Sequence, residues 1–220
     1  MLSCVVIFLD CLNKSPRNLY PALSTSPEIH FTNKIYFDKI QKLIENLDVD
    51  TKLSLEAISE HKTFIKGEYL LKAGSVCNYS YLVKSGIVRK FYVHQDREVT
   101  TEFFFNDHLA ISFDSYVLQK PSREYIQAVT DTVENMTDYN AFQNPKVLFP
   151  KLQELDFQMT EYYALGLEEM VFELHTQNAT QRYHTLLTKS PHIVQQVQLT
   201  QIASYLNISL ETLSRIRAKI

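Results

Sequence analysis

The longest periodic pattern in this sequence lies between residues 147 and 176. Apolar residues recur there every three or four positions, which is the spacing that lines one face of an α-helix. The apolar positions are Leu152, Leu155, Met159, Tyr163, Leu167, Met170 and Leu174. A helix over this range would be about 45 Å long at a rise of 1.5 Å per residue. One chain has little apolar surface with which to cover a stripe of that length. The fold must therefore pack this helix against the rest of the chain or against a second copy.

Upstream of this helix, the apolar period changes to two. Short β-rich runs punctuated by glycines lie between His61 and Tyr139. The runs cover residues 64–74, 79–93, 98–105 and 125–129. Several short strands without a long helix among them predict an antiparallel β-roll, or jelly roll. Helical spacing over 33–47, and more weakly over 51–59, predicts flanking helices, so the expected fold class is α+β.

The end of the chain, residues 198–220, has the pattern of two short helices joined by a tight turn. The apolar positions of their shared face are Ile202, Leu206, Ile208, Leu213 and Ile216. Ala203 is small where the two helices approach each other. Asn207 lies at the turn, where a residue that tolerates positive φ is needed. Since Ser209 can cap the second helix, the segment predicts a helix-turn-helix.

The outward face of the second helix carries residues suited to reading DNA. Glu211 and Arg215 are four residues apart, so their side chains point the same way. A carboxylate can accept from the cytosine amino group, a guanidinium can bind guanine O6 and N7, and Leu210 can rest on a thymine methyl. With the outward-facing Ser214, the remaining candidates for DNA contact, mainly with phosphates, are Thr200, Ser209, Thr212, Arg217 and Lys219. The alternative is an ordinary helical hairpin whose Glu211–Arg215 pair is a solvated surface bridge.

Residues 202–216 resemble the helix-turn-helix of the Crp–Fnr family, the cyclic-AMP receptor protein and its relatives. That family's recognition helix begins with a Ser-Arg-Glu-Thr-x-x-x-Arg pattern. The matching residues here are Ser209, Glu211, Thr212 and Arg215. Leu210 departs from the pattern, because the family often has an arginine at that place.

Three further stretches carry the same resemblance. Residues 66–74 (Lys-Gly-Glu-x-Leu-x-x-x-Gly) and 85–89 (Ser-Gly-x-Val-Arg) resemble the β-roll of cyclic-nucleotide-binding domains, and 179–187 resemble the first helix of the family's DNA-binding module. The resemblance implies a homodimer that pairs through the long helix and binds a palindromic operator in successive major grooves. It also implies a transcription regulator with RNA polymerase as a further partner. For the long helix, packing only on its own β-roll is the alternative.

These patterns predict an N-terminal extension, a sensor, a dimerisation helix and a DNA-binding module. The predicted boundaries are 1–33, 34–146, 147–176 and 177–220. Residues 2–9 are apolar but have no basic segment before them, which favours a loosely ordered extension over a secretion signal. No run is long enough to span a bilayer, so a cytoplasmic protein is expected.

Charge is distributed unevenly along the chain. The formal net charge is −3, but from Asn178 onward five basic residues accompany one acid, so this segment carries +4 and the rest −7. Such asymmetry fits a small basic module attached to an acidic body.

The sequence offers no group for catalysis or metal binding. The three cysteines, Cys4, Cys11 and Cys77, form neither an even disulfide set nor a zinc spacing, and are expected to be reduced thiols. Oxygen-sensing members of the family hold an iron–sulfur cluster with four cysteines, more than this sequence has. The histidines lack the spacing of metal ligands, and no nucleophile is grouped with a base. We therefore expect no metal, no cofactor and no enzymatic activity.

The β-roll lacks the cassette that the resemblance implies for a cyclic nucleotide, a Gly-Glu pair for the ribose and an Arg-Ser pair for the phosphate. Residues 104–111 contain neither glycine nor glutamate, and Arg123 stands one position late beside Glu124, which would repel a phosphate. We expect no cyclic AMP binding and leave Arg123 as a candidate for contact with an unidentified effector. The alternatives are a regulator controlled by its abundance, or a β-roll that binds a small molecule without any DNA-binding activity.

Overall fold

The structure is a computed structural model that describes residues 39–40 and 42–219. The extension predicted over 1–33 and the start of the helix predicted over 33–47 lie outside the described residues. The chain divides into two compact units, Met1–Ile58 with Ala141–Lys189, and Ser59–Asn140 with Ser190–Ile220. The second unit therefore joins the β-rich segment to the end of the chain.

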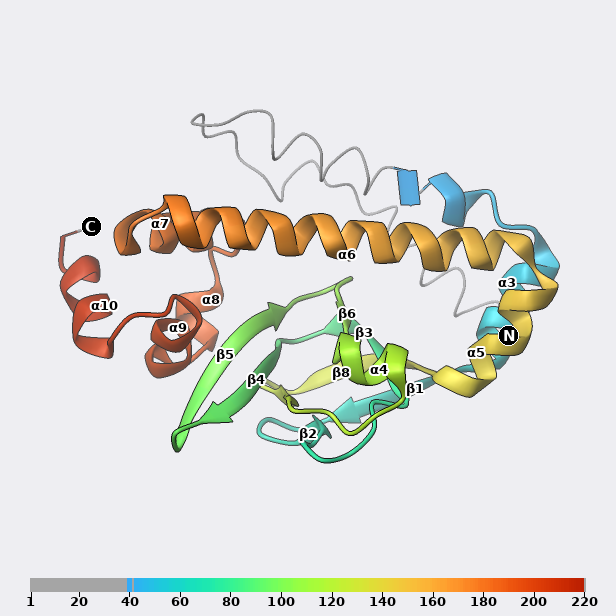
Figure 1. Ribbon diagram of the computed structural model, residues 1–220, viewed down its shortest axis with the longest axis horizontal. Coiled ribbons are helices and arrows are strands. Elements are labelled where there is room, and N and C mark those ends of the chain that lie inside the picture. Colours follow the sequence, from blue (N-terminus) through green and yellow to red (C-terminus); the bar gives the residue numbers. More distant parts are fainter. Residues whose placement is uncertain (1–38, 41, 220) are drawn as a thin grey trace. The chain divides into compact units, whose positions relative to one another are not determined.

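The β-rich segment is an antiparallel β-roll (Figure 1). Its strands are β1 (Ser59–Phe64), β2 (Tyr69–Leu71), β3 (Tyr79–Ser85), β4 (Val88–His94), β5 (Arg97–Phe104), β6 (Leu109–Ala110), β7 (Tyr125–Ala128) and β8 (Thr132–Asp138). They form two four-stranded sheets, in the orders β1-β8-β3-β6 and β2-β7-β4-β5. The predicted α+β class and antiparallel β-roll are thus confirmed.

The strand boundaries follow the turns more closely than the predicted runs did. The run over 79–93 is divided at Gly86, whose φ is +95°. A side chain there would collide with the Asp131 carbonyl and with Thr132, so the tight approach requires glycine. β8 lies outside the predicted runs, and the short helix α4 (Phe113–Leu118) had no periodic signal.

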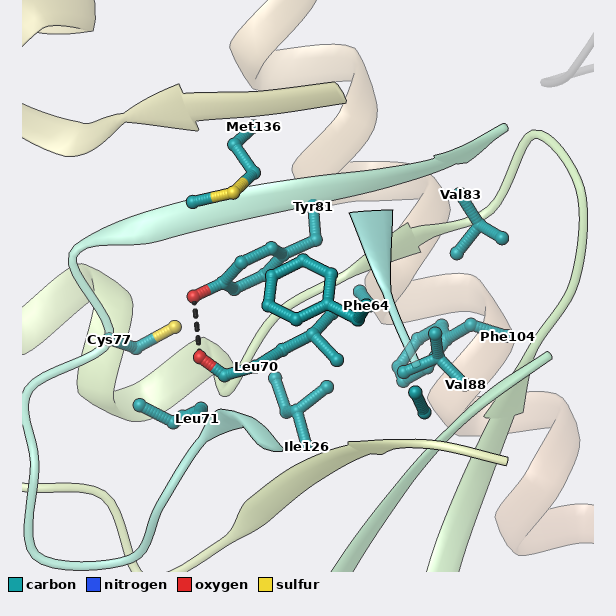
Figure 2. Packing of buried hydrophobic residues seen from close by; sticks show 12 residues of the cluster. Phe64, Leu70, Leu71, Cys77, Tyr81, Val83, Val88, Phe104, Ile126 and Met136 are labelled. Carbon is teal, nitrogen blue, oxygen red and sulfur yellow. Dashed lines mark hydrogen bonds between the residues drawn. The ribbon is translucent and has the colours of Figure 1, made fainter. Parts of the chain in front are cut away.

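The two sheets enclose an apolar core (Figure 2). Inward and outward residues alternate along β7 and β8, as expected for strands with one face toward a core. Figure 2 shows Tyr81 inside this core, where its hydroxyl donates to the Leu70 carbonyl at 2.8 Å. The polar end of that ring is therefore satisfied despite its burial.

The first unit is helical. It contains α3 (Val49–Ala57), most of α5 (Tyr139–Leu148), α6 (Pro150–Thr176) and α7 (Ala179–Lys189). Ile40, Ile44 and Leu47 pack with Leu152 and Leu155 of α6 in one buried cluster. The first turns of the long helix are thus covered by the chain's own N-terminal helical segment.

Of the four boundaries predicted for α6 and α7, three are reproduced, including the end of α6 at Thr176, and one is shifted. α6 begins at Pro150 and not at about residue 147, because a proline suits the first turn and Phe149 before it is extended. α7 begins and ends as predicted: the Asn178 side chain accepts from the Gln181 amide at 3.1 Å, and the helix stops at Lys189, ahead of Pro191. Among the described residues, no helix is both long and apolar enough to cross a membrane.

Candidate nucleic-acid interface

The end of the chain forms the expected pair of short helices, α9 (Leu199–Tyr205) and α10 (Leu210–Arg217), preceded by α8 (Ile193–Gln196). At the turn, Asn207 has a φ of +52°, the left-handed conformation that its position predicts. The Ile208 amide then donates to the Ala203 carbonyl at 3.0 Å. This bond closes the turn and directs the chain into α10.

α10 has a strong N-terminal cap. The Ser209 side chain is the cap predicted from the sequence and accepts from the Thr212 amide at 3.1 Å. Its hydroxyl also donates to the Thr212 hydroxyl at 2.9 Å. Glu211 in the first turn and Arg217 in the last complement the helix dipole.

The two helices bury one shared face. The fully or almost fully buried positions are Ile202, Ala203, Leu206, Leu213 and Ile216. The predicted Ile208 is half-buried. Apolar packing therefore fixes how α10 is rotated about its axis, and with it the side chains that face outward.

The predicted DNA contacts lie on the outward side of this pair. Exposed residues among them are Thr200, Ser209, Leu210, Glu211, Ser214, Arg215, Arg217 and Lys219. Thr212 is half-buried under the cap. The packing of the two helices therefore leaves most of the predicted contact residues accessible.

Glu211 and Arg215 are not paired with each other. Within residues 39–40 and 42–219, no ion pair joins them, and the Arg215 Nη2 donates to the Thr212 hydroxyl at 3.3 Å. The surface bridge that the hairpin alternative requires is therefore not formed here. Both charged groups remain directed to solvent.

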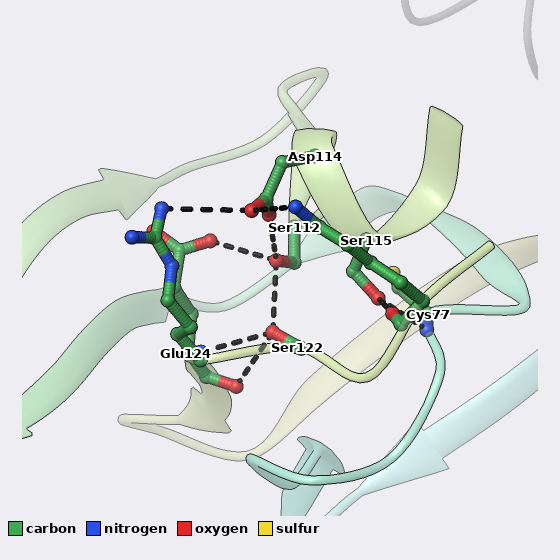
Figure 3. A network of polar contacts seen from close by, with 8 residues as sticks. Cys77, Ser112, Asp114, Ser115, Ser122 and Glu124 are labelled. Carbon is green, nitrogen blue, oxygen red and sulfur yellow. Dashed lines mark hydrogen bonds and ion pairs between the residues drawn. The ribbon is translucent and has the colours of Figure 1, made fainter. Parts of the chain in front are cut away.

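A polar network occupies the part of the β-roll where the resemblance implies the phosphate end of the cassette (Figure 3). The buried Ser112 hydroxyl donates to Glu124 Oε2 at 2.8 Å and lies 2.9 Å from the Ser122 hydroxyl. Asp114 Oδ2 lies 3.4 Å from Lys120 Nζ and 3.5 Å from Arg123 Nη2. Although partial burial opposes it, the hydrogen bond and charge of Lys120 lower the pKa of Asp114. The candidate Arg123 is thus engaged with a carboxylate, and 84% of its side chain is exposed.

A partly buried ion pair also lies in the roll, and it was not predicted from the sequence. Lys90 on β4 is almost completely buried, and its Nζ lies 2.9 Å from Glu102 Oε2 on β5 and 3.5 Å from the Ile111 carbonyl. The preceding Arg89 contacts Glu98 of β5 at 2.6 Å and Gln127 of β7 at 2.7 Å. Neighbouring residues on a strand point to opposite faces, so the sequence could have shown that one of these two adjacent cations faces inward and needs a partner.

The β-roll also has an open hollow of about 320 Å³ at β1, β2 and β3. Two lysines line it, each with its ammonium group over an aromatic ring. Lys62 Nζ lies 4.9 Å from the centre of the Phe64 ring, and Lys72 Nζ 5.5 Å from that of Tyr69. Glu68 also lines the hollow, so two cations accompany one carboxylate beside aromatic surface, and the remaining positive charge suits a small anion.

The predicted dimerisation stripe on α6 changes character along its length. Leu152 and Leu155 are buried within the first unit, so in this conformation they are not exposed for a second copy. Met159, Tyr163 and Met170 are half-buried, and Leu167 and Leu174 are 39% and 45% exposed. The exposed part of the stripe is its C-terminal half.

No group of three His, Cys, Asp or Glu side chains that could hold a metal ion occurs in the described part of the chain. Cys77 is buried in the roll, and burial raises the pKa of its thiol. The thiol is therefore held in its protonated, unreactive form.

Sequence comparison finds no matching family model but does find related regulators. The fumarate and nitrate reduction regulatory protein of Vibrio cholerae is 25% identical over 174 residues, which cover 73% of this chain and 68% of that protein. The electron transport regulator A of Shewanella oneidensis is 23% identical over 176 residues, 73% of this chain and 68% of that protein.

The fold is shared with solved structures of regulators. A protein described as a crp/fnr-family transcriptional regulator from Eubacterium rectale superposes with a TM-score of 0.60 at 17% identity, over 81% of this chain and 85% of its own. FixK2 from Bradyrhizobium japonicum gives 0.59 at 17% identity, over 74% and 84%.

Proposed function

We propose that this chain, which is of the Crp–Fnr type in sequence and fold, is a regulator of transcription. In this proposal it binds a palindromic DNA operator as a homodimer. The observation that carries the proposal is the surface of α10. Its apolar side is buried, and the side chains left outside include one carboxylate and one guanidinium four residues apart. A helix with this division fits the major groove, where base edges differ in their donors and acceptors.

In this proposal, Glu211 and Arg215 read bases. Arg215 is exposed, and one nitrogen of its guanidinium donates to the Thr212 hydroxyl at 3.3 Å, which leaves its other N–H groups available for a base. Arg217 and Lys219 lie exposed at the end of the same helix and would contact phosphates, which position the helix without reading sequence. Thr200 on α9 and the cap Ser209 would make further phosphate contacts.

The dimer would form through the exposed half of α6. Leu167, Met170 and Leu174 recur at intervals of three and four, which is the spacing of one seam between paired helices. Leu167 and Leu174 expose apolar surface that a monomer leaves in water. Two recognition helices related by a two-fold axis would then contact successive major grooves.

We further propose that cyclic AMP is not the effector. The polar site around Ser112 already contains two carboxylates, Asp114 and Glu124, and Glu124 accepts the hydrogen bond that Ser112 can give. The two cations of this site are already paired with Asp114, so a phosphate placed here would meet the Glu124 carboxylate and an occupied hydroxyl donor. Lys90 is likewise neutralised by Glu102 inside the roll.

The hollow lined by Lys62 and Lys72 favours a second candidate function, the binding of a small aromatic anion. Thermal-shift measurements with benzoate and with cyclic AMP would compare ligand binding at this hollow with ligand binding at the polar site around Ser112. A ligand that binds the folded state raises its stability by mass action. Benzoate should raise the melting temperature of the wild type and not of Lys72→Gln; equal shifts in both proteins would refute this site.

The test of DNA recognition uses two arginines on one helix. A preferred sequence is first selected from a random DNA pool, and its affinity is then compared with that of a mismatched sequence. Arg215→Ala should lose about 1–3 kcal/mol of discrimination per half-site. Arg217→Ala should weaken binding to all sequences alike. It should also lower the slope of log affinity against log salt concentration by about one for each subunit of the dimer. Equal discrimination before and after Arg215→Ala would exclude it as a base reader. A wild type that binds no DNA would leave the small-molecule module as the function.

A further inference from the structure

α9 is joined to the β-roll by a hydroxyl group placed against a strand edge. The Ser204 hydroxyl accepts from the Thr100 amide at 2.9 Å and donates to the Glu98 carbonyl at 2.8 Å. Both backbone groups belong to β5, the outer strand of its sheet. An edge strand presents amides and carbonyls without a neighbouring strand, and a hydroxyl can satisfy one of each.

An aromatic contact lies beside this bond. The ring of Tyr205 packs against that of Phe103 on β5, with centroids 5.3 Å apart and an angle of 58° between the ring planes. Phe103 is almost completely buried. The joint therefore combines two directional hydrogen bonds with a buried apolar contact, which together fix one orientation.

The strand end that receives Ser204 is itself held in place. Arg89 on β4 is 3% exposed and lies 2.6 Å from the Glu98 carboxylate. The same guanidinium donates to Gln127 on β7 and stacks on Phe91, with Cζ 4.1 Å from the ring centre. A continuous polar chain thus runs from β7 through β4 and β5 to α9.

We propose that the α9–β5 joint sets the orientation in which α10 is presented to DNA, with Ser204 as its positioning residue. The inference rests on the proposed DNA-binding function. The joint engages α9 and leaves the outward side chains of α10 exposed, so it directs the reading helix without masking it. In a dimer whose two helix-turn-helix segments are held in this way, the two recognition helices lie at one fixed separation. A protein with such preorganised helices binds its operator more tightly than one whose helices must first be ordered.

The first experiment needs no DNA. Hydrogen exchange of the Thr100 amide is measured in the full-length wild type, in Ser204→Ala and in Ser204→Thr. Loss of two ordinary hydrogen bonds weakens docking by about 30-fold, so exchange at Thr100 should rise by about that factor in Ser204→Ala. Ser204→Thr keeps the hydroxyl and should behave as the wild type. Since alanine favours a helix more than serine does, amides within α9 should keep their protection, which excludes unfolding of the helix.

The second experiment uses operators whose two half-sites are separated by different distances around one helical turn. The wild type should prefer one spacing, and Ser204→Ala should lose about five-fold or more of that preference, while its preference for the half-site sequence is unchanged. Equal Thr100 exchange in the wild type and Ser204→Ala would refute the joint. Faster exchange with an unchanged spacing preference would refute its positioning role. A wild type without DNA affinity would instead refute the proposed function, and the exchange data would still decide whether the joint exists.

Discussion

Glu134 on β8 allows a quantitative test of the β-roll interior. Its side chain is fully buried, and its Oε1 accepts a hydrogen bond from the Thr132 hydroxyl. Burial raises the pKa of this carboxyl from an ordinary value of 4.5 to about 7, although the hydrogen bond from Thr132 opposes the shift. At neutral pH, the folded protein therefore holds a carboxyl that is partly protonated.

The sign of the pH dependence follows from this shift. The folded state keeps the proton up to about pH 7, whereas the unfolded chain releases it near pH 4.5. Between these values the folded state binds more protons, so the free energy of unfolding falls as the pH rises. The stabilisation is fully present below pH 4.5 and is lost as the pH passes 7. At 1.36 kcal/mol per pKa unit, the loss is about 3 kcal/mol.

Glu134→Gln removes the titration and keeps an acceptor for Thr132. Urea unfolding at several pH values from 5 to 8, at one protein concentration, gives the free energy of unfolding for both proteins. Histidines also titrate in this range, so the difference between the two profiles is the informative quantity. Because part of the loss falls below pH 5, that difference should change by about 2.5 kcal/mol over the range, and Glu60→Gln, at an exposed position on β1, should show no such change. Parallel profiles for wild type and Glu134→Gln would refute the reasoning.

Other substitutions separate dimerisation, core packing and turn geometry. Leu174→Glu places a charge on the exposed part of the α6 stripe and should halve the mass measured by light scattering; an unchanged mass would place the dimer contact elsewhere. Leu152→Ala empties a position in the intrachain cluster and should lower the free energy of unfolding by about 2–5 kcal/mol, with the mass unchanged. At the left-handed Asn207, glycine should be tolerated, whereas valine should destabilise the helix pair by about 1–3 kcal/mol, measured by thermal unfolding followed by circular dichroism.

The helix-turn-helix could be predicted residue by residue because its determinants are local. The positive φ of Asn207, the cap at Ser209 and the buried face of α10 each depend on residues within one or two turns of helix. The same reasoning could not find the joint at Ser204. Its partners Glu98 and Thr100 lie more than 100 positions away, and no local pattern distinguishes this serine from other polar helix residues.

Periodicity has a similar limit on α6. The spacing of three and four residues identified the stripe but carried no information on what covers each part. Leu152 and Leu155 are covered by Ile40, Ile44 and Leu47 of the same chain, and the C-terminal half of the stripe is exposed. In the β-roll, alternation places one of Arg89 and Lys90 inward, but the pairing of Lys90 with Glu102 depends on the register of β4 and β5.

The uneven charge of the chain explains why α9 would hold the helix pair to the β-roll while α10 binds DNA. An acidic body repels DNA, so attraction must come from the few cations of the basic end. Lys189 is already engaged, with its Nζ 2.8 Å from Glu173 and 3.4 Å from Glu169. The exposed cations on and after α10 are then needed for DNA, and any contact that buried them against carboxylates of the chain would cancel the attraction. A joint formed through the uncharged Ser204 and Tyr205 holds the helix pair to the roll while leaving those cations exposed.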